Sequence, residues 1–320
     1  MKILVTGAAG FIGSNLAYKL ALRGDEVVGL DNFNDYYDPA KKRANQRRLA
    51  SLPNVTMVEA DLRDRPAMLA LFERGFDAVA HLAGMGGVRN SIQHPALYME
   101  VNTNGTQNLL DAAREAGGVG NFVFASTSSV YGATERIPFV ESDPCDRPLQ
   151  PYAASKRAAE LLGYTYHYLF GINFTAVRFF TVYGPYNRPD MMAYLVPKSI
   201  TSGQEIPLYE GDMRRDWTFV DDITDGITLA LERPLGYEII NLGRGEPTRL
   251  HDFIAALEAL AGKEAHLVKT PKPAADIYYT YADISKARRL LGFDPQVSVA
   301  EGVKRLWAWF SAEQALPQRR

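Results

Sequence analysis

The chain has 320 residues, of which 47% are hydrophobic and 22% charged, and its formal net charge at pH 7 is −2. This charge is too small to gather nucleic acid or anionic lipid, so neither partner is predicted. The single cysteine, Cys145, excludes a disulfide framework and a thiolate metal cluster, and we predict no metal site. No apolar run approaches a membrane span of roughly eighteen residues, and the first strand leaves no room for a signal peptide, so we expect a cytoplasmic protein.

The N-terminal segment reads as strand, turn, helix and second strand. Ile3 to Val5 form an apolar run typical of a buried strand, and the apolar positions after Phe11 predict a helix. The small residues between them allow a sharp turn and bring the helix N-terminus close to a diphosphate. These small residues are Gly7, Ala8, Ala9, Gly10 and Gly13.

Asp31 ends the second predicted strand, about twenty residues after the glycines. A carboxylate there can accept both ribose hydroxyls of an adenosine and repels a 2′-phosphate, which predicts NAD rather than NADP. The basic run downstream can in principle hold a phosphate, but we interpret it as a solvated helix face. It comprises Lys41, Lys42, Arg43, Arg47 and Arg48.

Strands and helices then alternate through the first half of the chain. Strands are predicted at 55–60, 76–82, 121–125 and 175–179, with helices near 40–50, 95–116 and 152–170. This order is typical of a doubly wound parallel α/β sheet, a Rossmann fold, in which ligands bind beyond the carboxyl ends of the strands.

The domain prediction divides the chain into two parts. Residues 1–179, rejoined by about 217–243, form the Rossmann domain, because Tyr237 to Leu242 reads as one more strand. Residues 180–216 and 244–320 have longer Pro- and Gly-rich loops, and we expect a smaller α/β lobe that binds the substrate.

Two residues near strand ends have competing interpretations. Asp61 follows the third strand and can reach an adenine amino group, or it can cap the helix from Arg63 onward. His81 lies inside the fourth strand and is predicted to be a core residue rather than a ligand.

Three residues carry the chemical signal. Thr127 ends the fifth strand, Tyr152 opens the long helix, and Lys156 lies four residues later on the same helix face. An adjacent ammonium and a nicotinamide ring both favour a phenolate, which predicts that Tyr152 accepts a proton near neutral pH while Thr127 orients the substrate hydroxyl. Tyrosine and lysine four apart occur on many surface helices, but their position after a dinucleotide turn favours catalysis.

With these motifs the chain resembles the extended short-chain dehydrogenases/reductases of the nucleotide-sugar epimerase and dehydratase group, from TGAAGFIG near its start to YADISKARRLLGF near its end. The resemblance implies a homodimer that pairs through the helices carrying Asn102 and Tyr152, and it favours Asp61 as a cofactor contact. It implies NAD contacts at Gly7, Gly10, Phe11, Ile12, Gly13, Asp31, Asn32, Asp61, Leu62, Leu82, Ala83, Asn102, Tyr152 and Lys156.

The resemblance also bears on the reaction. Dehydratases and decarboxylating synthases of the group usually have an acidic residue before the VYG segment, where this chain has Ser129. A neutral hydroxyl there favours chemistry at one carbon, which is 4-epimerisation of a UDP-sugar through a 4-keto intermediate.

The segments LDNFNDYYDPAKKR, GVRNSIQHP and TVYGPYNRPDM most resemble the UDP-glucuronate 4-epimerase branch, which implies Arg188 beside the sugar carboxylate. A guanidinium suits that task because it offers parallel donors to two oxygens, although alone it would read as a surface arginine in a turn. Further UDP-sugar contacts are implied at Arg89, Thr127, Ser128, Ser129, Thr181, Lys198, Tyr209, Arg215 and Asp276.

Three alternatives stay open. The chain can be a 4-epimerase for a neutral UDP-hexose or UDP-N-acetylhexosamine, or a UDP-glucuronate decarboxylase. The third is a degenerate member that binds NAD as a structural or regulatory ligand, against which the intact Thr127, Tyr152 and Lys156 argue.

Overall fold

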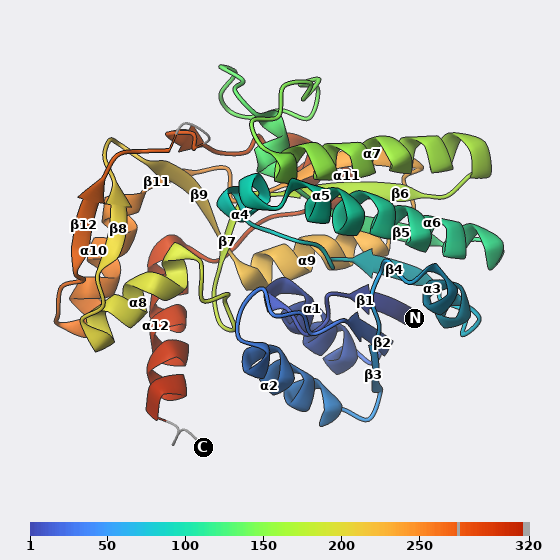
Figure 1. The fold of residues 1–320 in the computed structure, drawn as a ribbon, viewed down its shortest axis with the longest axis horizontal. Coiled ribbons are helices and arrows are strands. Elements are labelled where there is room, and N and C mark those ends of the chain that lie inside the picture. Colours follow the sequence, from blue (N-terminus) through green and yellow to red (C-terminus); the bar gives the residue numbers. More distant parts are fainter. Residues whose placement is uncertain (274–275, 316–320) are drawn as a thin grey trace.

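A seven-stranded parallel sheet runs through the larger part of the computed structural model, which describes residues 1–273 and 276–315 (Figure 1). The strand order is β10-β6-β5-β4-β1-β2-β3. The strands are β1 (Lys2–Thr6), β2 (Glu26–Asp31), β3 (Val55–Glu59), β4 (Ala78–His81), β5 (Asn121–Thr127), β6 (Phe174–Phe179) and β10 (Tyr237–Leu242). The predicted doubly wound sheet is confirmed, and its order reverses beside β1, where a ligand crevice is expected.

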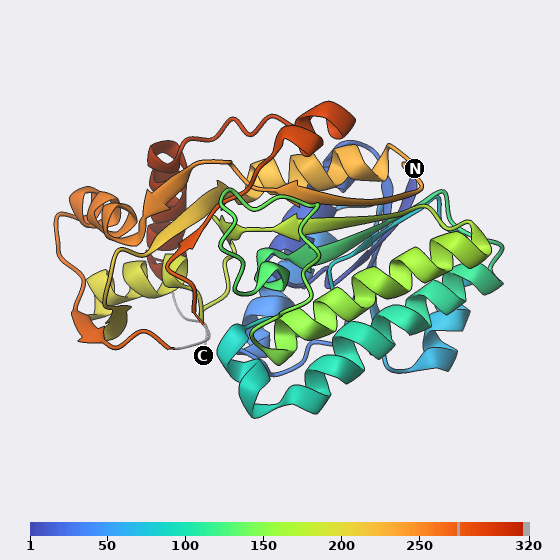
Figure 2. The ribbon, with the colours of Figure 1, turned by 90° about the horizontal axis from the view of Figure 1, so that it is seen from above.

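Helices cover both faces of this sheet, which explains why its inner strands are apolar throughout. In β1, Ile3 and Val5 pack with α1 (Phe11–Leu22), α2 (Pro39–Ala50) and α9 (Val220–Leu231), whereas Leu4 packs with α3, α6 and α7. The opposite-face helices are α3 (Arg65–Phe72), α6 (Gly105–Glu115) and α7 (Pro151–Phe170). Figure 2 shows α6 and α7 side by side along this face.

Short helices adjoin the carboxyl ends of the strands. They are α4 (Val88–Gln93), α5 (Pro95–Tyr98), a π-helical turn η1 (Met99–Asn104) and a 3-10 turn η2 (Ser128–Tyr131). The long helix predicted near 95–116 is therefore three segments, because the π turn interrupts it at Asn102. No helix in the described ranges has the length and apolarity needed to cross a bilayer.

The smaller lobe lies beyond the carboxyl ends of the large sheet, on the left of Figures 1 and 2. Its central strand β9 (Arg214–Phe219) pairs with β7 (Thr181–Tyr183), β11 (Pro247–Arg249) and β13 (Tyr279–Thr280). The other elements of this lobe are β8 (Ile206–Tyr209), β12 (Leu267–Thr270), α8 (Met192–Ser202), α10 (Leu250–Ala261) and α12 (Val299–Ala315). Helix α11 (Ser285–Leu291) packs against β10 and α9 of the larger part instead. Strand β10 pairs with β6 in the large sheet. Strand β9 spans the boundary expected near residue 217, and the predicted domain boundaries stay predictions.

Buried polar side chains hold segments together in both the large sheet and the smaller lobe. Asp216 accepts hydrogen bonds from the amides of Arg244 (2.7 Å), Gly245 (2.9 Å) and Ala282 (3.1 Å), which holds β9 against two later segments. His81 is fully buried between the hydroxyls of Thr6 (2.7 Å) and Thr106 (2.9 Å), so its predicted place in the core is confirmed.

Candidate active site

The glycine turn between β1 and α1 is closely packed against the neighbouring backbone. Gly7 has φ +69°, and a Cβ on it would lie 2.8 Å from the amide nitrogen of Ala83, after β4. A Cβ on Gly13 would lie 2.0 Å from the Gly7 carbonyl oxygen, whereas one on Gly10 would meet only that oxygen, at 3.1 Å. Helix α1 therefore packs directly on the turn, and the space beside Gly10 fits a diphosphate at the helix N-terminus.

One pocket extends from this turn to the carboxyl ends of β5 and β6. It brings together all but one of the predicted NAD contacts with two residues predicted for catalysis or substrate binding, Thr127 and Arg188. The predicted residues that line it are Gly7, Gly10, Phe11, Ile12, Gly13, Asp31, Asn32, Asp61, Leu62, Leu82, Ala83, Thr127, Tyr152, Lys156 and Arg188.

Asn102 is the predicted cofactor contact that does not line the pocket. Its Oδ1 accepts from the Met85 amide at 2.7 Å, and its Nδ2 donates to the Met85 carbonyl and to the Ser155 hydroxyl, each at 3.0 Å. The amide thus fastens the loop after β4 to α7, and its contact with NAD stays a prediction.

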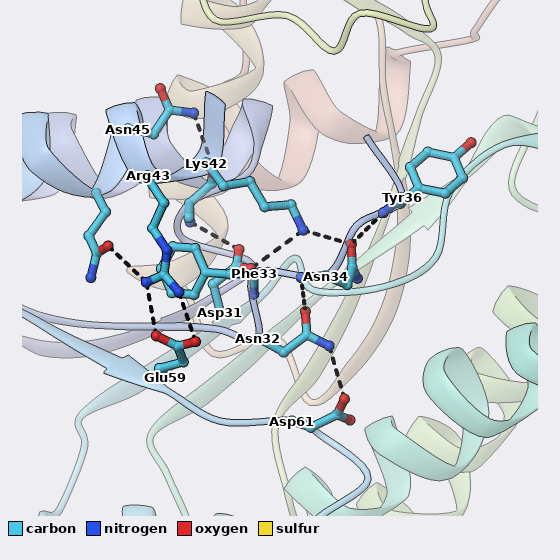
Figure 3. A network of polar contacts seen from close by, with 12 residues as sticks. Asp31, Asn32, Phe33, Asn34, Tyr36, Lys42, Arg43, Asn45, Glu59 and Asp61 are labelled. Atoms are coloured by element: carbon cyan, nitrogen blue, oxygen red, sulfur yellow. Dashed lines mark hydrogen bonds and ion pairs between the residues drawn. The ribbon is translucent and has the colours of Figure 1, made fainter. Parts of the chain in front are cut away.

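Asp31 lines the pocket and belongs to a network of polar contacts with the loop after β2 and with α2 (Figure 3). Its oxygens accept from the amides of Ala9 (3.1 Å) and Phe33 (2.9 Å), while Lys42 Nζ lies 3.6 Å from Oδ1 and donates to Asn34 Oδ1 at 2.8 Å. The Lys42 side chain is only 7% exposed, so the prediction of a solvated helix face is wrong for this residue. Lys42 lies on the face of α2 that meets the loop after β2, so its ammonium reaches Asp31 and Asn34.

The other basic residues of α2 pack on aromatic rings. The Arg43 guanidinium lies 3.7 Å from the centre of the Phe33 ring and binds Glu59 through two hydrogen bonds of 2.9 Å. The Arg48 guanidinium lies 3.8 Å from the centre of the Tyr186 ring, and Lys41 Nζ lies 4.6 Å from the centre of the Tyr194 ring. Arg47 makes no such contact and is exposed, as predicted. None of these contacts requires a bound phosphate.

Asp61 does not cap the helix that follows it. Its Oδ2 accepts from Asn32 Nδ2 at 2.9 Å, and hydrogen bonds from Arg63 hold the pKa of its carboxyl well below the usual range. Asp64, rather than Asp61, caps α3, because its Oδ1 accepts from the Ala67 amide at 3.0 Å. Contact of Asp61 with adenine stays a prediction.

Thr127, Tyr152 and Lys156 meet at the other end of the pocket. Burial raises the pKa of the Tyr152 hydroxyl, while its hydrogen bond with Thr127 and the positive charge of Arg188 act to lower it. Lys156 Nζ donates to the Ala125 carbonyl at 2.9 Å, and no hydrogen bond in the described ranges joins it to Tyr152. The positive charge of Arg188 therefore acts to favour the phenolate, and the same role predicted for Lys156 stays a prediction.

Burial also lowers the pKa of Lys156 to about 7, although the carboxylate of Glu160 acts to raise it. Between pH 7 and the ordinary value of 10.5, the unfolded chain holds a proton that the folded chain does not, so the folded state is destabilised below pH 10.5. We therefore expect Lys156→Met to raise the free energy of unfolding of the protein without cofactor by about 2 kcal/mol at pH 7.

Urea unfolding at several pH values measures this difference, which should shrink as the pH rises from 7 to 10. The matched control is Lys198→Met on the exposed surface of α8, which should change stability little. A destabilised Lys156→Met protein at pH 7 would show that the ammonium is held charged in the folded state.

A second pocket adjoins the first, and Tyr36 and Met191 line both. It is lined by five of the predicted substrate contacts: Arg89, Thr181, Tyr209, Arg215 and Asp276. Arg89 lies 4.7 Å from the Tyr209 ring centre and 3.9 Å from Asp276 Oδ2, so it reaches from the large domain to the smaller lobe. Ser128, Ser129 and Lys198 line neither pocket, and their substrate contacts stay predictions.

Several pocket residues were missed by the sequence analysis. Those at strand ends, Ser126, Phe179 and Phe180, could have been found from the rule that ligands bind beyond the carboxyl ends. Others come from loops and from α2, whose side-chain directions no local pattern indicated: Asn34, Tyr36, Tyr37, Lys42 and Met191.

The reversed strand order beside β1, the glycine turn, the acid at the end of β2 and the Tyr-Lys helix define a dinucleotide-binding α/β protein of the short-chain dehydrogenase/reductase type. The profile of the NAD dependent epimerase/dehydratase family matches residues 3–243. The chain belongs to this family, and its predicted place in the nucleotide-sugar epimerase group is confirmed.

Within the epimerase group, the chain is similar to several UDP-glucuronate 4-epimerases. A UDP-glucuronate 4-epimerase of Thermodesulfobacterium geofontis is 44% identical over 309 residues, which are 96% of this chain and 95% of that protein. UDP-glucuronate 4-epimerase 3 of Arabidopsis thaliana is 40% identical over 97% of this chain and 76% of its own. The crystal structure of UDP-glucuronic acid 4-epimerase from Bacillus cereus, in complex with UDP-glucuronic acid and NAD, superposes with a TM-score of 0.90 at 34% identity and covers 98% of this chain and 100% of that one.

Proposed function

We propose that the protein is an NAD-dependent 4-epimerase that interconverts UDP-glucuronate and UDP-galacturonate. The observation that carries this proposal is the place of Arg188, which lines the catalytic pocket close enough to Tyr152 for its charge to lower the pKa of the phenol. A partly buried guanidinium beside the proton acceptor suits a sugar that carries a carboxylate. The identities and the B. cereus complex support the same substrate.

In the proposed mechanism, Tyr152 removes the proton from the 4-hydroxyl, and Thr127 orients that hydroxyl through its own side chain. NAD, when bound, would supply the hydride acceptor and donor for C4. Rotation of the 4-keto sugar in the pocket would present the opposite face of C4 to the returning hydride, and Tyr152 would give its proton back to the 4-oxygen. The turn at Gly7 to Gly13 and the carboxylate of Asp31 would hold the dinucleotide throughout.

The 4-keto uronate is a β-keto acid, which loses carbon dioxide when the bond to its carboxylate stands perpendicular to the ketone plane. Arg188 would bind the carboxylate and keep it out of that alignment, with the hydroxyls of Thr127, Ser128 and Ser129 as further proposed contacts. Epimerisation without decarboxylation then follows from how the carboxylate is held.

Arg188→Ala tests the assignment. We expect KM for UDP-glucuronate to rise at least about 10-fold, or UDP-pentose to accumulate, because a buried charge-assisted contact is lost. UDP-galacturonate and UDP-pentose are quantified separately by chromatography, with UDP-glucose as the substrate that lacks the carboxylate. If KM and products both stay unchanged, Arg188 does not bind the carboxylate; release of carbon dioxide as the main reaction of the wild type would identify a decarboxylase instead.

We also propose a cytoplasmic homodimer that pairs through α7 and the helices beside it. Apolar side chains recur at i, i+3, i+7 and i+8 along α7 and are exposed: Leu161 (52%), Tyr164 (51%), Tyr168 (76%) and Leu169 (59%). A stripe of this size on one helix supports a second copy as its partner. The buried thiol of Cys145 is compatible with a reducing compartment.

Size-exclusion chromatography with light scattering should therefore give the mass of a dimer for the wild type. The double variant Leu161→Arg, Tyr168→Arg should be a monomer, because each copy would bury two charges at the contact. Leu260→Arg, at an exposed leucine of α10 in the smaller lobe, is the matched control and should remain dimeric. A monomeric wild type would contradict the proposed pairing.

A further inference from the structure

The guanidinium of Arg188 is held along one edge by a neighbouring carboxylate. Its Nε donates to Asp190 Oδ1 at 3.0 Å and its Nη2 donates to Asp190 Oδ2 at 2.7 Å, which is a bidentate arrangement. The third nitrogen, Nη1, takes no part in this pair and lies against Gly86, where a Cβ would approach it to 2.4 Å. The absence of a side chain at Gly86 therefore provides the space in which Nη1 lies.

Tyr36 supports the pair from the loop after β2. Its hydroxyl donates to Asp190 Oδ2 at 3.3 Å, and the Arg188 guanidinium lies 5.4 Å from the centre of its ring. Gly87 has φ +101°, and a Cβ there would lie 2.3 Å from the Tyr36 hydroxyl oxygen. The two glycines thus let the arginine, the aspartate and the tyrosine pack against the loop after β4.

The pair is charged and lies where the two pockets meet. Burial acts to raise the pKa of Asp190, but the hydrogen bonds and charge of Arg188 outweigh it and hold that pKa below its usual range. Arg188 lines the pocket of Tyr152, Asp190 lines the second pocket, and Tyr36 lines both. A sugar that links a diphosphate in the second pocket to the catalytic tyrosine in the first would pass this cluster.

We propose that Asp190, supported by Tyr36, is a positioning residue that fixes the orientation of the Arg188 guanidinium before a uronate binds. It occupies the Nε–Nη2 edge, so that the guanidinium offers its remaining Nη1 edge to the sugar carboxylate. The proposal rests on the proposed function, in which Arg188 binds that carboxylate. Asp190 itself is not proposed to touch the substrate.

Preorganisation gives this arrangement its value. An arginine side chain loses rotamer freedom when it is fixed, and a guanidinium already held by Asp190 does not lose that freedom again on binding. The opposite expectation is that Asp190 competes with the substrate for the same cation, in which case its removal would tighten the binding of a uronate. The two expectations differ in sign.

The experiment uses isothermal titration of full-length protein saturated with NAD, with Tyr152→Phe as the background so that no turnover occurs. The ligands are UDP-glucuronate and UDP-glucose, which differ in the carboxylate. We expect Asp190→Ala to weaken UDP-glucuronate about 10-fold and UDP-glucose less than about 2-fold. Asp190→Asn, which can still accept a hydrogen bond, should recover part of the loss and serves if the alanine variant is poorly folded.

A double-mutant cycle with Arg188→Ala distinguishes the possibilities. If Asp190 acts through Arg188, Asp190→Ala should have no effect on UDP-glucuronate binding once Arg188 is absent. An effect that persists there, an equal loss for both sugars, or tighter binding of UDP-glucuronate would overturn the proposal. An Arg188→Ala protein that still prefers the uronate would instead contradict the proposed function of Arg188.

The matched control is Asp212→Ala. Asp212 also pairs with an arginine two residues away, since Arg214 Nε and Nη2 donate to its Oδ2 at 2.9 and 2.8 Å. Neither member of that pair lines either of the two pockets described above, so its loss should leave the affinity for both sugars unchanged.

Discussion

Tyr152→Phe is expected to lower kcat for epimerisation at least about 1,000-fold, because general acid–base catalysis is lost at both steps. The phenol is the group placed to take the proton from the 4-hydroxyl and return it, and its ring would remain packed against Tyr98. Binding of NAD and UDP-glucuronate should change less than about 3-fold, since only one hydroxyl is removed. Turnover is measured by product chromatography and binding by titration calorimetry.

The control is Tyr166→Phe, which removes a hydroxyl from the same helix, where it donates to Asp111 at 2.7 Å. Tyr166 lines neither pocket, so kcat should stay within about 2-fold of the wild type. Retention of turnover in Tyr152→Phe would show that another group carries the proton, and the proposed mechanism would then be wrong.

Gly13→Ala should abolish detectable NAD binding and destabilise the protein by about 3 kcal/mol or more, because the added methyl group would overlap the Gly7 carbonyl. The calculated separation of 2.0 Å is to backbone, which cannot move without opening the turn between β1 and α1. Calorimetric titration with NAD and thermal unfolding of the protein without cofactor measure the two effects.

Gly10→Ala is the matched variant and separates binding from folding. Its φ of −78° and ψ of −177° suit alanine, and the added methyl group would meet only the Gly7 carbonyl oxygen at 3.1 Å. Stability should therefore fall by less than about 1 kcal/mol, while NAD affinity should fall at least about 10-fold because the methyl group enters the space proposed for the diphosphate. Unchanged affinity in Gly10→Ala would show that the cofactor does not approach the helix N-terminus there.

Lys156 illustrates what local spacing can and cannot predict. The four-residue interval correctly placed Tyr152 and Lys156 on one helix face and in one pocket. It could not show that the Ala125 carbonyl at the end of β5 would accept from the ammonium, or that Arg188 would supply the charge that acts on the phenol. Both partners come from other parts of the chain.

Lys42 makes the same point for the cofactor site. A basic run in a helix reads as a solvated face, and the charges of α2 taken alone support no other interpretation. The loop between β2 and α2 turns that face toward Asp31 and Asn34, so the ammonium is buried beside a carboxylate. The charge of a residue in a helix does not by itself predict whether its side chain faces solvent or a binding site.

The sequence by itself determined the doubly wound sheet, because strand–turn–helix units repeat at short intervals, and the epimerase family, because the resemblance extends over nearly the whole chain. It also predicted the NAD turn and the set of Thr127, Tyr152 and Lys156, which line one pocket. The tertiary structure alone decided how Arg188, Asp190 and Tyr36 meet between the two pockets, and how Asn102 fastens a loop. These contacts join segments that are far apart in the chain, and their geometry depends on the packing of the two lobes rather than on local periodicity.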